Sequence, residues 1–279
     1  MHMPTAFWFC HHAADPFFNM AFDECMLEHV NRQPDQILLR LYTWQPGAIT
    51  IGVNQSLERA VRIEALGGTP LIRRITGGRA VYHDESELTY CVALNLDEVA
   101  LPSQSRSVNT VYLRLAEGLR SFLEKIGVSA QIVRRTGLAP VSRVWDAEHP
   151  CFVSAARYEL LAKGKKILAS AQRQIGSAVL QHGSIKLRGV AFHPALPTMS
   201  KAFGGLPQSH DRSDVERKAE QFAREVAAVL GVAAEGQMCA ANDLEAFVGL
   251  TDRWRSIREA PLMRRDLIEH HTGKDSLLV

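Results

Sequence analysis

The chain has 279 residues and a formal net charge of +2, from 32 basic and 30 acidic side chains. This length allows one large domain, or a domain with a small appendage, and a sizeable core. The near balance of charge argues against a nucleic-acid partner held by a broad basic face. Five widely spaced cysteines without a CxxC pattern indicate neither disulfides nor a zinc knuckle, which fits a cytoplasmic protein. No stretch approaches the roughly 20 apolar residues that span a bilayer, so we expect no membrane association.

A helix is predicted near the start of the chain. Asp15 followed by Pro16 is typical of a helix N-terminus. The side chains behind it fall on one stripe at helical spacing, and they are Phe18, Phe22, Cys25 and Met26. We therefore expect Cys25 to be a packed core thiol.

The middle of the chain predicts strands and one long helix. In chain order we expect a strand over 37–44, a returning hairpin strand over 48–53, a helix over 57–66, a strand over 88–96, a helix over 108–127 and a short strand over 130–134. Residues 136–150 lose periodicity and predict a mobile loop. Three strands then form a meander, over 152–161, 167–174 and 178–187. Two helices, over 214–230 and 243–258, precede a charged tail.

The run from Arg73 to Asp84 contains a glycine bend between two strands. Gly77 and Gly78 allow the backbone to adopt φ > 0 and to approach a ligand closely. The bend is surrounded by three arginines and a histidine, which are Arg73, Arg74, Arg79 and His83. These side chains suit a carboxylate, a phosphate or an acyl handle, although a surface turn with solvated charges fits the twelve residues equally well.

A second polar cluster lies on the meander. It comprises Lys165 and Lys166, Ser170 to Gln172, and Gln181 to Ser184, which neighbouring antiparallel strands bring together. Lys166 would lower the pKa of a nearby thiol, which makes Cys151 a candidate nucleophile. Taken singly, Cys151 also fits a buried small hydrophobe, Lys166 a solvated strand residue and His182 a structural histidine.

A metal site is not predicted. Cys10-His11-His12 and His270-His271 are runs of adjacent residues, whose side chains point apart, and no second ligand pair stands at a useful spacing.

Several motifs in register resemble the lipoate-protein ligase and octanoyltransferase family, which shares its fold with biotin protein ligase catalytic domains. The motifs are 18–24, 52–55, 73–84, 87–90, Cys151-Phe152, 158–160, 164–167, 170–172 and 180–185. Their order is similar to that of LipM-type octanoyltransferases, whose nucleophilic cysteine stands at the position of Cys151. The resemblance covers roughly residues 5 to 190. It implies an α+β fold of mixed, largely antiparallel sheets flanked by helices, with a catalytic domain over 1–235 and a C-terminal helical extension over 236–279.

The resemblance also implies a reaction. A catalytic pair, Cys151 and Lys166, would take an octanoyl or lipoyl group from octanoyl-acyl carrier protein as a thioester. The group would pass to a lysine of a lipoyl domain or of the glycine-cleavage H protein, with no cofactor. The residues implied to bind substrate are Asn54, Arg73, Arg74, Thr76, Gly77, Gly78, Arg79, His83, Ser170, Gln172, His182 and Gly183.

Three alternatives stand beside this transferase. An ATP-dependent lipoate or octanoate ligase would use ATP and magnesium to form an acyl-adenylate, and Asn54 matches that branch better. A LipB-type transferase is disfavoured, because its cysteine position is held here by Val179 and Leu180. A non-catalytic binder of lipoyl domains would be expected to lose Lys166 or the glycine bend, and both are present.

Overall fold

Two β-sheets organise the computed structural model, which describes residues 4–99, 107–133, 160–187, 192–196, 211–234 and 249–263. The larger sheet has seven strands in the order β1-β2-β6-β10-β9-β8-β7. Their bounds are β1 Thr5–Ala14, β2 Gln36–Trp44, β6 Leu88–Asn95, β7 Gln131–Ile132, β8 Leu160–Ala162, β9 Lys165–Ile175 and β10 Ala178–Ile185. The three strands of the smaller sheet, in the order β4-β3-β5, are β3 Ala48–Ile51, β4 Leu71–Arg73 and β5 Val81–His83.

The larger sheet is antiparallel at every pairing except that of β1 with β2, which is parallel. All eight residues of β6 and all eight of β10 are buried, which is expected of central strands covered on both faces. The predicted meander is confirmed where the structure describes it, because β10 pairs with β9 and β9 with β8. The predicted residues 152–159 of its first strand lie outside the described ranges.

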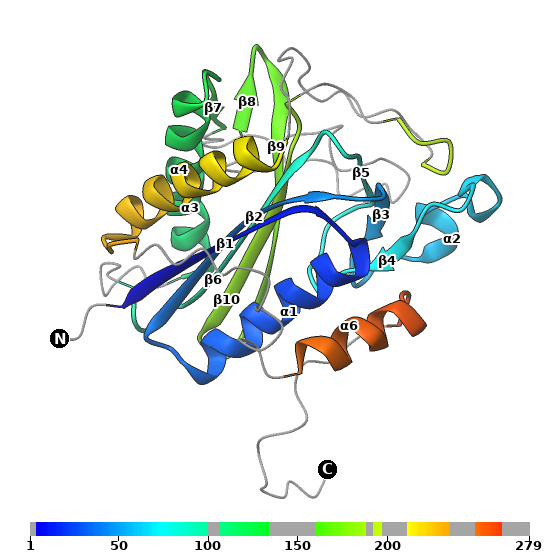
Figure 1. The fold of residues 1–279 in the computed structure, drawn as a ribbon, viewed down its shortest axis with the longest axis horizontal. Coiled ribbons are helices and arrows are strands. Elements are labelled where there is room, and N and C mark those ends of the chain that lie inside the picture. Colours follow the sequence, from blue (N-terminus) through cyan, green and yellow to red (C-terminus); the bar gives the residue numbers. More distant parts are fainter. Residues whose placement is uncertain are drawn as a thin grey trace, which may run out of the picture.

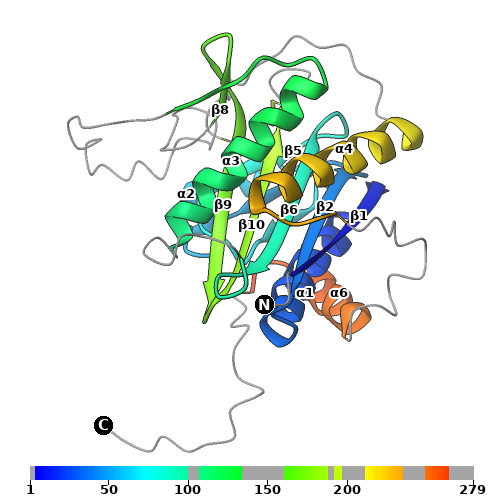
Figure 2. The same cartoon turned by 90° about the vertical axis from the view of Figure 1, so that its left-hand side faces the viewer.

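Helices cover the two faces of the larger sheet (Figures 1 and 2). On one face lie α3 (Val108–Lys125) and α4 (Arg212–Leu230), which bury the apolar stripes that their sequences predict. On the other face lie α1 (Pro16–Arg32) and α6 (Leu250–Glu259). No helix in the described ranges combines the length and apolar character needed to cross a membrane.

The start of α1 confirms the sequence prediction. An oxygen of the Asp15 carboxylate accepts hydrogen bonds from the backbone N–H groups of Phe17 and Phe18, each at 3.0 Å. Cys25 is only 2% exposed, within the apolar cluster between α1 and the sheet. Burial raises the pKa of this thiol to about 12, as expected of a packed core cysteine.

The helix α6 lies against α1. Arg253 donates to Glu24 at 3.0 Å, and the indole N–H of Trp254 donates to Asp15 at 3.0 Å. Leu250 and Ile257 are fully buried in the cluster that α1 also fills. The described part of the expected C-terminal extension therefore packs on α1, and the expected boundary at 235 falls outside the described residues.

The smaller sheet contradicts the predicted hairpin over 37–53. The strand β3 does not pair with β2; it pairs in parallel with β4 and antiparallel with β5. The turn residues after Trp44 lead the chain into the other sheet. The predicted helix over 57–66 is also shorter than expected, because only α2 (Leu57–Ala60) and a 3₁₀ turn over Ile63–Ala65 form. The strand β1 was not predicted.

Candidate active site

A pocket lies where the smaller sheet meets the α1 face of the larger one. The walls of the pocket come from both sheets, from α1 and from residues 74–80, which we call the glycine loop. The lining residues are Met20, Tyr42, Trp44, Thr50, Arg74, Gly78, Val81, His83, Thr89, Ala169 to Ala171 and His182 to Ser184. Apolar side chains with a few convergent polar groups are the usual lining of a small-molecule site.

The glycine loop connects β4 with β5, the two strands that flank β3. Gly78 has φ of +92°, a conformation that residues with a Cβ rarely adopt, and it is exposed at the pocket. Gly77 has no positive φ. The backbone freedom that the sequence allows at both glycines is therefore used at Gly78 and not at Gly77.

Arg74 is buried inside this loop, with 6% exposure. Within the described residues its guanidinium donates five hydrogen bonds, as many as it has N–H groups. Nη2 donates to the backbone oxygens of Gly77 at 2.7 Å and Arg79 at 2.9 Å. Nη1 donates to the backbone and hydroxyl oxygens of Thr50, each at 3.2 Å, and Nε to Thr76 Oγ1 at 3.1 Å. In this arrangement Arg74 holds the loop rather than presenting its charge to a ligand.

Arg73 is half-buried and, like Arg74, donates to backbone oxygens. Its Nη1 donates to the carbonyl oxygens of Gly52, Val53 and Gln55, and its Nε donates to that of Leu262 at 2.9 Å. These bonds join the turn after β3 to the chain after α6. Arg79 is half-buried and Asn54 is exposed, and neither lines the pocket.

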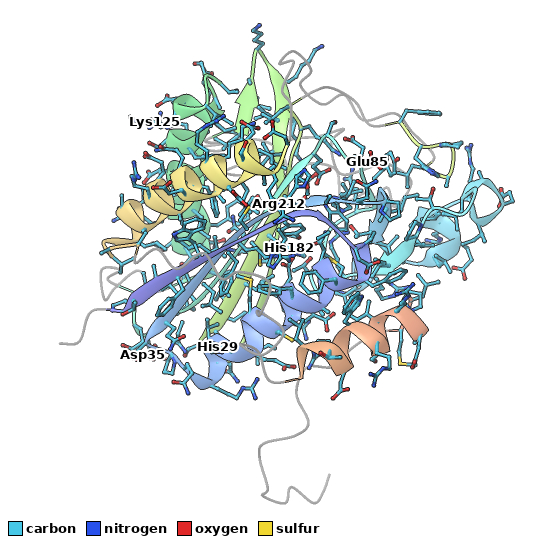
Figure 3. The ribbon with its side chains drawn as sticks, viewed as in Figure 1. His29, Asp35, Glu85, Lys125, His182 and Arg212 are labelled. Atoms are coloured by element: carbon cyan, nitrogen blue, oxygen red, sulfur yellow. The ribbon has the colours of Figure 1, made fainter. Side chains whose placement is uncertain are left out.

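His182 lies in the interior of the molecule (Figure 3), on the pocket face of β10. Its Nδ1 is 2.9 Å from Asp23 Oδ2, and its Nε2 is 2.7 Å from Thr76 Oγ1. Asp23 also accepts hydrogen bonds from Arg40 and from the Tyr42 hydroxyl, each at 2.8 Å. Burial opposes ionisation of Asp23, but His182, Arg40 and Tyr42 outweigh it and hold the pKa of this carboxyl below its usual range.

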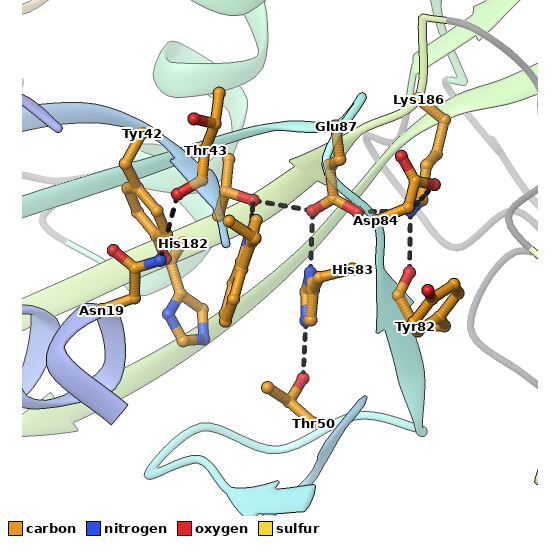
Figure 4. A network of polar contacts seen from close by, with 12 residues as sticks. Asn19, Tyr42, Thr43, Thr50, Tyr82, His83, Asp84, Glu87, His182 and Lys186 are labelled. Atoms are coloured by element: carbon orange, nitrogen blue, oxygen red, sulfur yellow. Dashed lines mark hydrogen bonds and ion pairs between the residues drawn. The ribbon is translucent and has the colours of Figure 1, made fainter. Parts of the chain in front are cut away.

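His83 is the second pocket histidine, and its surroundings repeat the pattern (Figure 4). Its Nδ1 is 2.7 Å from Glu87 Oε1 and its Nε2 is 2.8 Å from Thr50 Oγ1. The ring stacks on Trp44, with centroids 4.1 Å apart. Glu87 is also bonded to Lys186, which is 3% exposed. Burial lowers the pKa of His83, although Glu87 opposes that shift.

Three polar side chains of the meander, those of Ser170, Gln172 and Gln181, lie on the face of β9 and β10 that α3 and α4 cover. Gln172 Nε2 donates to Gln181 Oε1 at 2.7 Å, and Gln181 in turn donates to the Tyr90 hydroxyl at 2.7 Å. The same hydroxyl is bonded to Ser170 Oγ at 2.7 Å. Since Tyr90 belongs to the core beneath α3 and α4, the side chains of Ser170 and Gln172 point away from His182. Ser170 borders the pocket, and Gln172 does not.

Gly183 is required by close packing between three strands. A Cβ at this position would lie 2.6 Å from the carbonyl oxygen of Ala169 and 2.6 Å from a ring carbon of Tyr90. The absence of a side chain lets β9, β10 and β6 approach at the wall of the pocket.

Of the two predicted catalytic residues, the structure describes only Lys166. Lys166, at the start of β9, is 5% exposed and does not line the pocket. Cys151 and the predicted loop over 136–150 lie outside the described residues.

Sequence reasoning missed the acidic members of the site, Asp23 and Glu87, and the basic members Arg40 and Lys186. A signal for one of them was present, because Asp23 stands between Phe22 and Cys25 on the apolar side of the predicted helix. An acidic residue in such a stripe is seldom buried without a partner.

The fold of the chain is similar to that of solved lipoate-protein ligases. A lipoate-protein ligase A bound with ATP superposes with a TM-score of 0.63 at 18% identity, over 92% of this chain and 95% of the other. A bipartite lipoate protein ligase of Thermoplasma acidophilum superposes with a TM-score of 0.65 at 15% identity, over 96% of this chain and all of the other. At these identities the likeness concerns the fold alone.

The sequence comparison specifies the family. The model of the lipoyl protein ligase A/B catalytic domain matches residues 15–238, and the chain belongs to that family. Among curated relatives, octanoyltransferase LipM of Moorella thermoacetica is 38% identical over 178 residues, which is 62% of each chain. Octanoyltransferase LipM of Bacillus subtilis is 33% identical over 177 residues, again 62% of each. The chain thus matches less than two thirds of these relatives' length.

Proposed function

We propose that this protein is an acyltransferase that moves an octanoyl group from octanoyl-acyl carrier protein to a lysine of a lipoyl domain or of a glycine-cleavage H protein. The observation that carries the proposal is the identity of 33% to 38% with proteins named octanoyltransferase LipM. The partly apolar pocket beside the glycine loop supports it, because an eight-carbon chain gains about 0.8 kcal/mol for each buried CH₂ group.

The transfer takes place in two balanced steps. The thiolate of Cys151 attacks the carbonyl carbon of the carrier thioester, a new C–S bond forms, and the carrier leaves as a thiolate that takes up a proton. The neutral amine of the acceptor lysine then attacks the enzyme thioester, the C–S bond to Cys151 breaks, and the amine loses a proton. Lys166 favours the Cys151 thiolate by its positive charge. An amide is more stable than a thioester, so the reaction requires no ATP.

The other predicted residues bind or position substrate in this proposal. Backbone N–H groups of the loop at Gly77 and Gly78 donate to the acyl oxygen as negative charge develops on it. His83, His182 and Gly183 form the wall against which the acyl group lies. Arg79 faces the acidic carrier protein or its phosphopantetheine arm.

An ATP-dependent ligase is the second candidate, because the chain shares its fold with a lipoate-protein ligase A that was solved with ATP. In that case Lys166 would bind the acyl-adenylate, Cys151 would have no chemical role, and ATP with magnesium would be required. The same residues therefore predict different consequences of one substitution.

The intact mass of an apo lipoyl domain, measured after incubation with the enzyme, distinguishes these functions. One reaction contains octanoyl-acyl carrier protein without ATP, and the other contains free octanoate with ATP and magnesium. We expect acylation in the first reaction only, abolished by Cys151→Ser and retained by Cys10→Ser, a half-buried cysteine of β1 outside the pocket lining. Acylation in the second reaction only, retained by Cys151→Ser, would establish the ligase.

Lys166 has a matched control in its neighbour. Lys165 lies one residue earlier on the same strand and is exposed, whereas Lys166 is buried. We expect Lys166→Ala to abolish formation of the acyl-enzyme on Cys151 and Lys165→Ala to leave it intact. Equal activity of the two variants would remove Lys166 from the mechanism.

A further inference from the structure

Two chains of buried side chains connect a carboxylate to the same guanidinium. One chain runs from Asp23 through His182 to Thr76, and the hydroxyl of Thr76 accepts from Arg74 Nε. The other runs from Glu87 through His83 to Thr50, and the hydroxyl of Thr50 accepts from Arg74 Nη1. Each of these seven residues is at most 6% exposed.

We propose, taking the pocket as the acyl site of the function proposed above, that Asp23 and Glu87 are positioning residues that act through their histidines and threonines on Arg74. Arg74 in turn fixes the glycine loop through its bonds to the backbone oxygens of Gly77 and Arg79. The two carboxylates thereby determine where the loop N–H groups point, although neither carboxylate touches the loop.

The protons on each chain follow from the donors and acceptors available. A carboxylate only accepts, so the proton of each imidazole stands on Nδ1, facing Asp23 or Glu87. In the neutral ring Nε2 is then an acceptor, and it receives the single hydroxyl proton of Thr76 or Thr50. The hydroxyl oxygen keeps a lone pair for Arg74. Every link of both chains has the required polarity.

Charge gives the reason for the arrangement. Arg74 is a buried cation, and its partners include the hydroxyls of Thr76 and Thr50, at which the two chains end. A buried charge needs compensation, and hydrogen bonds in series polarise one another. Each threonine hydroxyl is therefore a stronger acceptor because a histidine and a carboxylate stand behind it. Two carboxylates share the stabilisation of one guanidinium.

The structure predicts what an amide would do in place of either carboxylate. In Asp23→Asn the amide oxygen must face the Arg40 guanidinium, which lies 2.8 Å from Asp23 Oδ1, so the NH₂ group faces His182 and Tyr42. In Glu87→Gln the oxygen must face the Lys186 ammonium, so the NH₂ group faces His83 and the Thr89 hydroxyl. Each substitution should move the proton of its own histidine from Nδ1 to Nε2.

Two-bond ¹H–¹⁵N spectra of histidine-labelled protein show directly which ring nitrogen of each histidine carries the proton. We expect the Nδ1–H form for His83 and His182 in the unsubstituted protein, a change to Nε2–H at His182 alone in Asp23→Asn, and a change at His83 alone in Glu87→Gln. Glu24→Gln is the matched control, since Glu24 is buried next to Asp23 on α1 but pairs with Arg253. It should alter neither ring. An Nε2–H form in the unsubstituted protein would overturn the proposal.

Amide hydrogen exchange over residues 76–80 tests the consequence for the loop. We expect exchange there to rise about threefold to tenfold in Asp23→Asn and in Glu87→Gln, the effect of weakening one net hydrogen bond, and to stay unchanged in Glu24→Gln. If Asp23→Asn does not fold, Thr76→Val breaks the same chain at its other end and should give the same rise while His182 keeps its Nδ1 proton.

Where both variants fold, combining Asp23→Asn with Thr76→Val should add little to either single change. Unchanged exchange in the single variants, or a rise in the double variant equal to the product of the two single effects, would refute the link. Neither the spectra nor the exchange uses an acyl donor, so the outcome is independent of whether the proposed transferase activity is found.

Discussion

Substitution of Lys186 by methionine tests how strongly the polar network stabilises the fold. The side chains of Lys186 and Glu87 are 3% and 0% exposed, and the ammonium is bonded both to Glu87 and, at 2.8 Å, to the carbonyl oxygen of Tyr82. Methionine has a similar length and no charge, so Lys186→Met leaves Glu87 buried without its cation. Removing one partner of a buried pair costs about 3–5 kcal/mol of unfolding free energy.

Lys218 supplies the control for this prediction. It is also buried, at 4% exposure, but its partner Asp214 on α4 is 14% exposed and separated from it by one helical turn. Water can take over the solvation of Asp214, so Lys218→Met should lower the free energy of unfolding by about 0–1 kcal/mol. Urea unfolding followed by circular dichroism measures both. Equal, small losses would refute the view that Glu87 depends on Lys186.

The pH dependence of stability follows from the same pair. Burial alone would raise the pKa of Glu87. The contacts with His83 and Lys186 outweigh burial and lower this pKa from 4.5 to about 2. Between these pH values the unfolded chain binds a proton that the folded protein does not, so stability falls as the pH falls. In Lys186→Met the pKa of Glu87 rises, and we expect a flatter decline below pH 4.5 in urea unfolding at a series of pH values. A decline as steep as that of the unsubstituted protein would contradict this account.

Two further predictions concern packing. Gly183→Ala should lower the free energy of unfolding by about 1–3 kcal/mol, because the new Cβ would lie 2.6 Å from the carbonyl oxygen of Ala169. Gly77→Ala is the control: its Cβ would meet no atom within 4 Å, so the urea midpoint should change little. Trp254→Phe should cost about 0.5–1.5 kcal/mol by removing the hydrogen bond to Asp15, and an unchanged midpoint would show that this bond does not contribute to the stability of the fold.

Local patterns in the sequence predicted the elements whose stability is local. The helices α1, α3 and α4 have caps and apolar stripes that can be recognised within one element, and the meander has turns between neighbouring strands. The pairing of β3 was not predictable in this way. Its partners β4 and β5 come later in the chain, and a turn before a strand specifies a reversal of direction but not the sheet that the strand joins.

The buried polar chains were not predictable for a related reason. Asp23 is separated by 17 residues from Arg40 and by 159 from His182. An isolated acidic residue in a helix has the same appearance in sequence whether it is solvated or paired inside a core. The resemblance to a family identified His83 and His182 as site residues, but only the three-dimensional arrangement connects them to their carboxylates.

The arginines of the glycine loop show that residue type alone leaves two uses of a side chain open. Positive charge around a flexible bend favours recognition of an anion, and the sequence supports that hypothesis for Arg73 and Arg74 alike. In the structure Arg74 has no N–H group beyond the five that already donate to the protein. An anion that recruited its Nη2 would have to replace the bonds to the Gly77 and Arg79 carbonyls and would thereby release the loop whose N–H groups surround the acyl oxygen in the proposed reaction. Binding through Arg74 and preorganisation of the loop are therefore competing uses of one guanidinium, and its burial favours preorganisation.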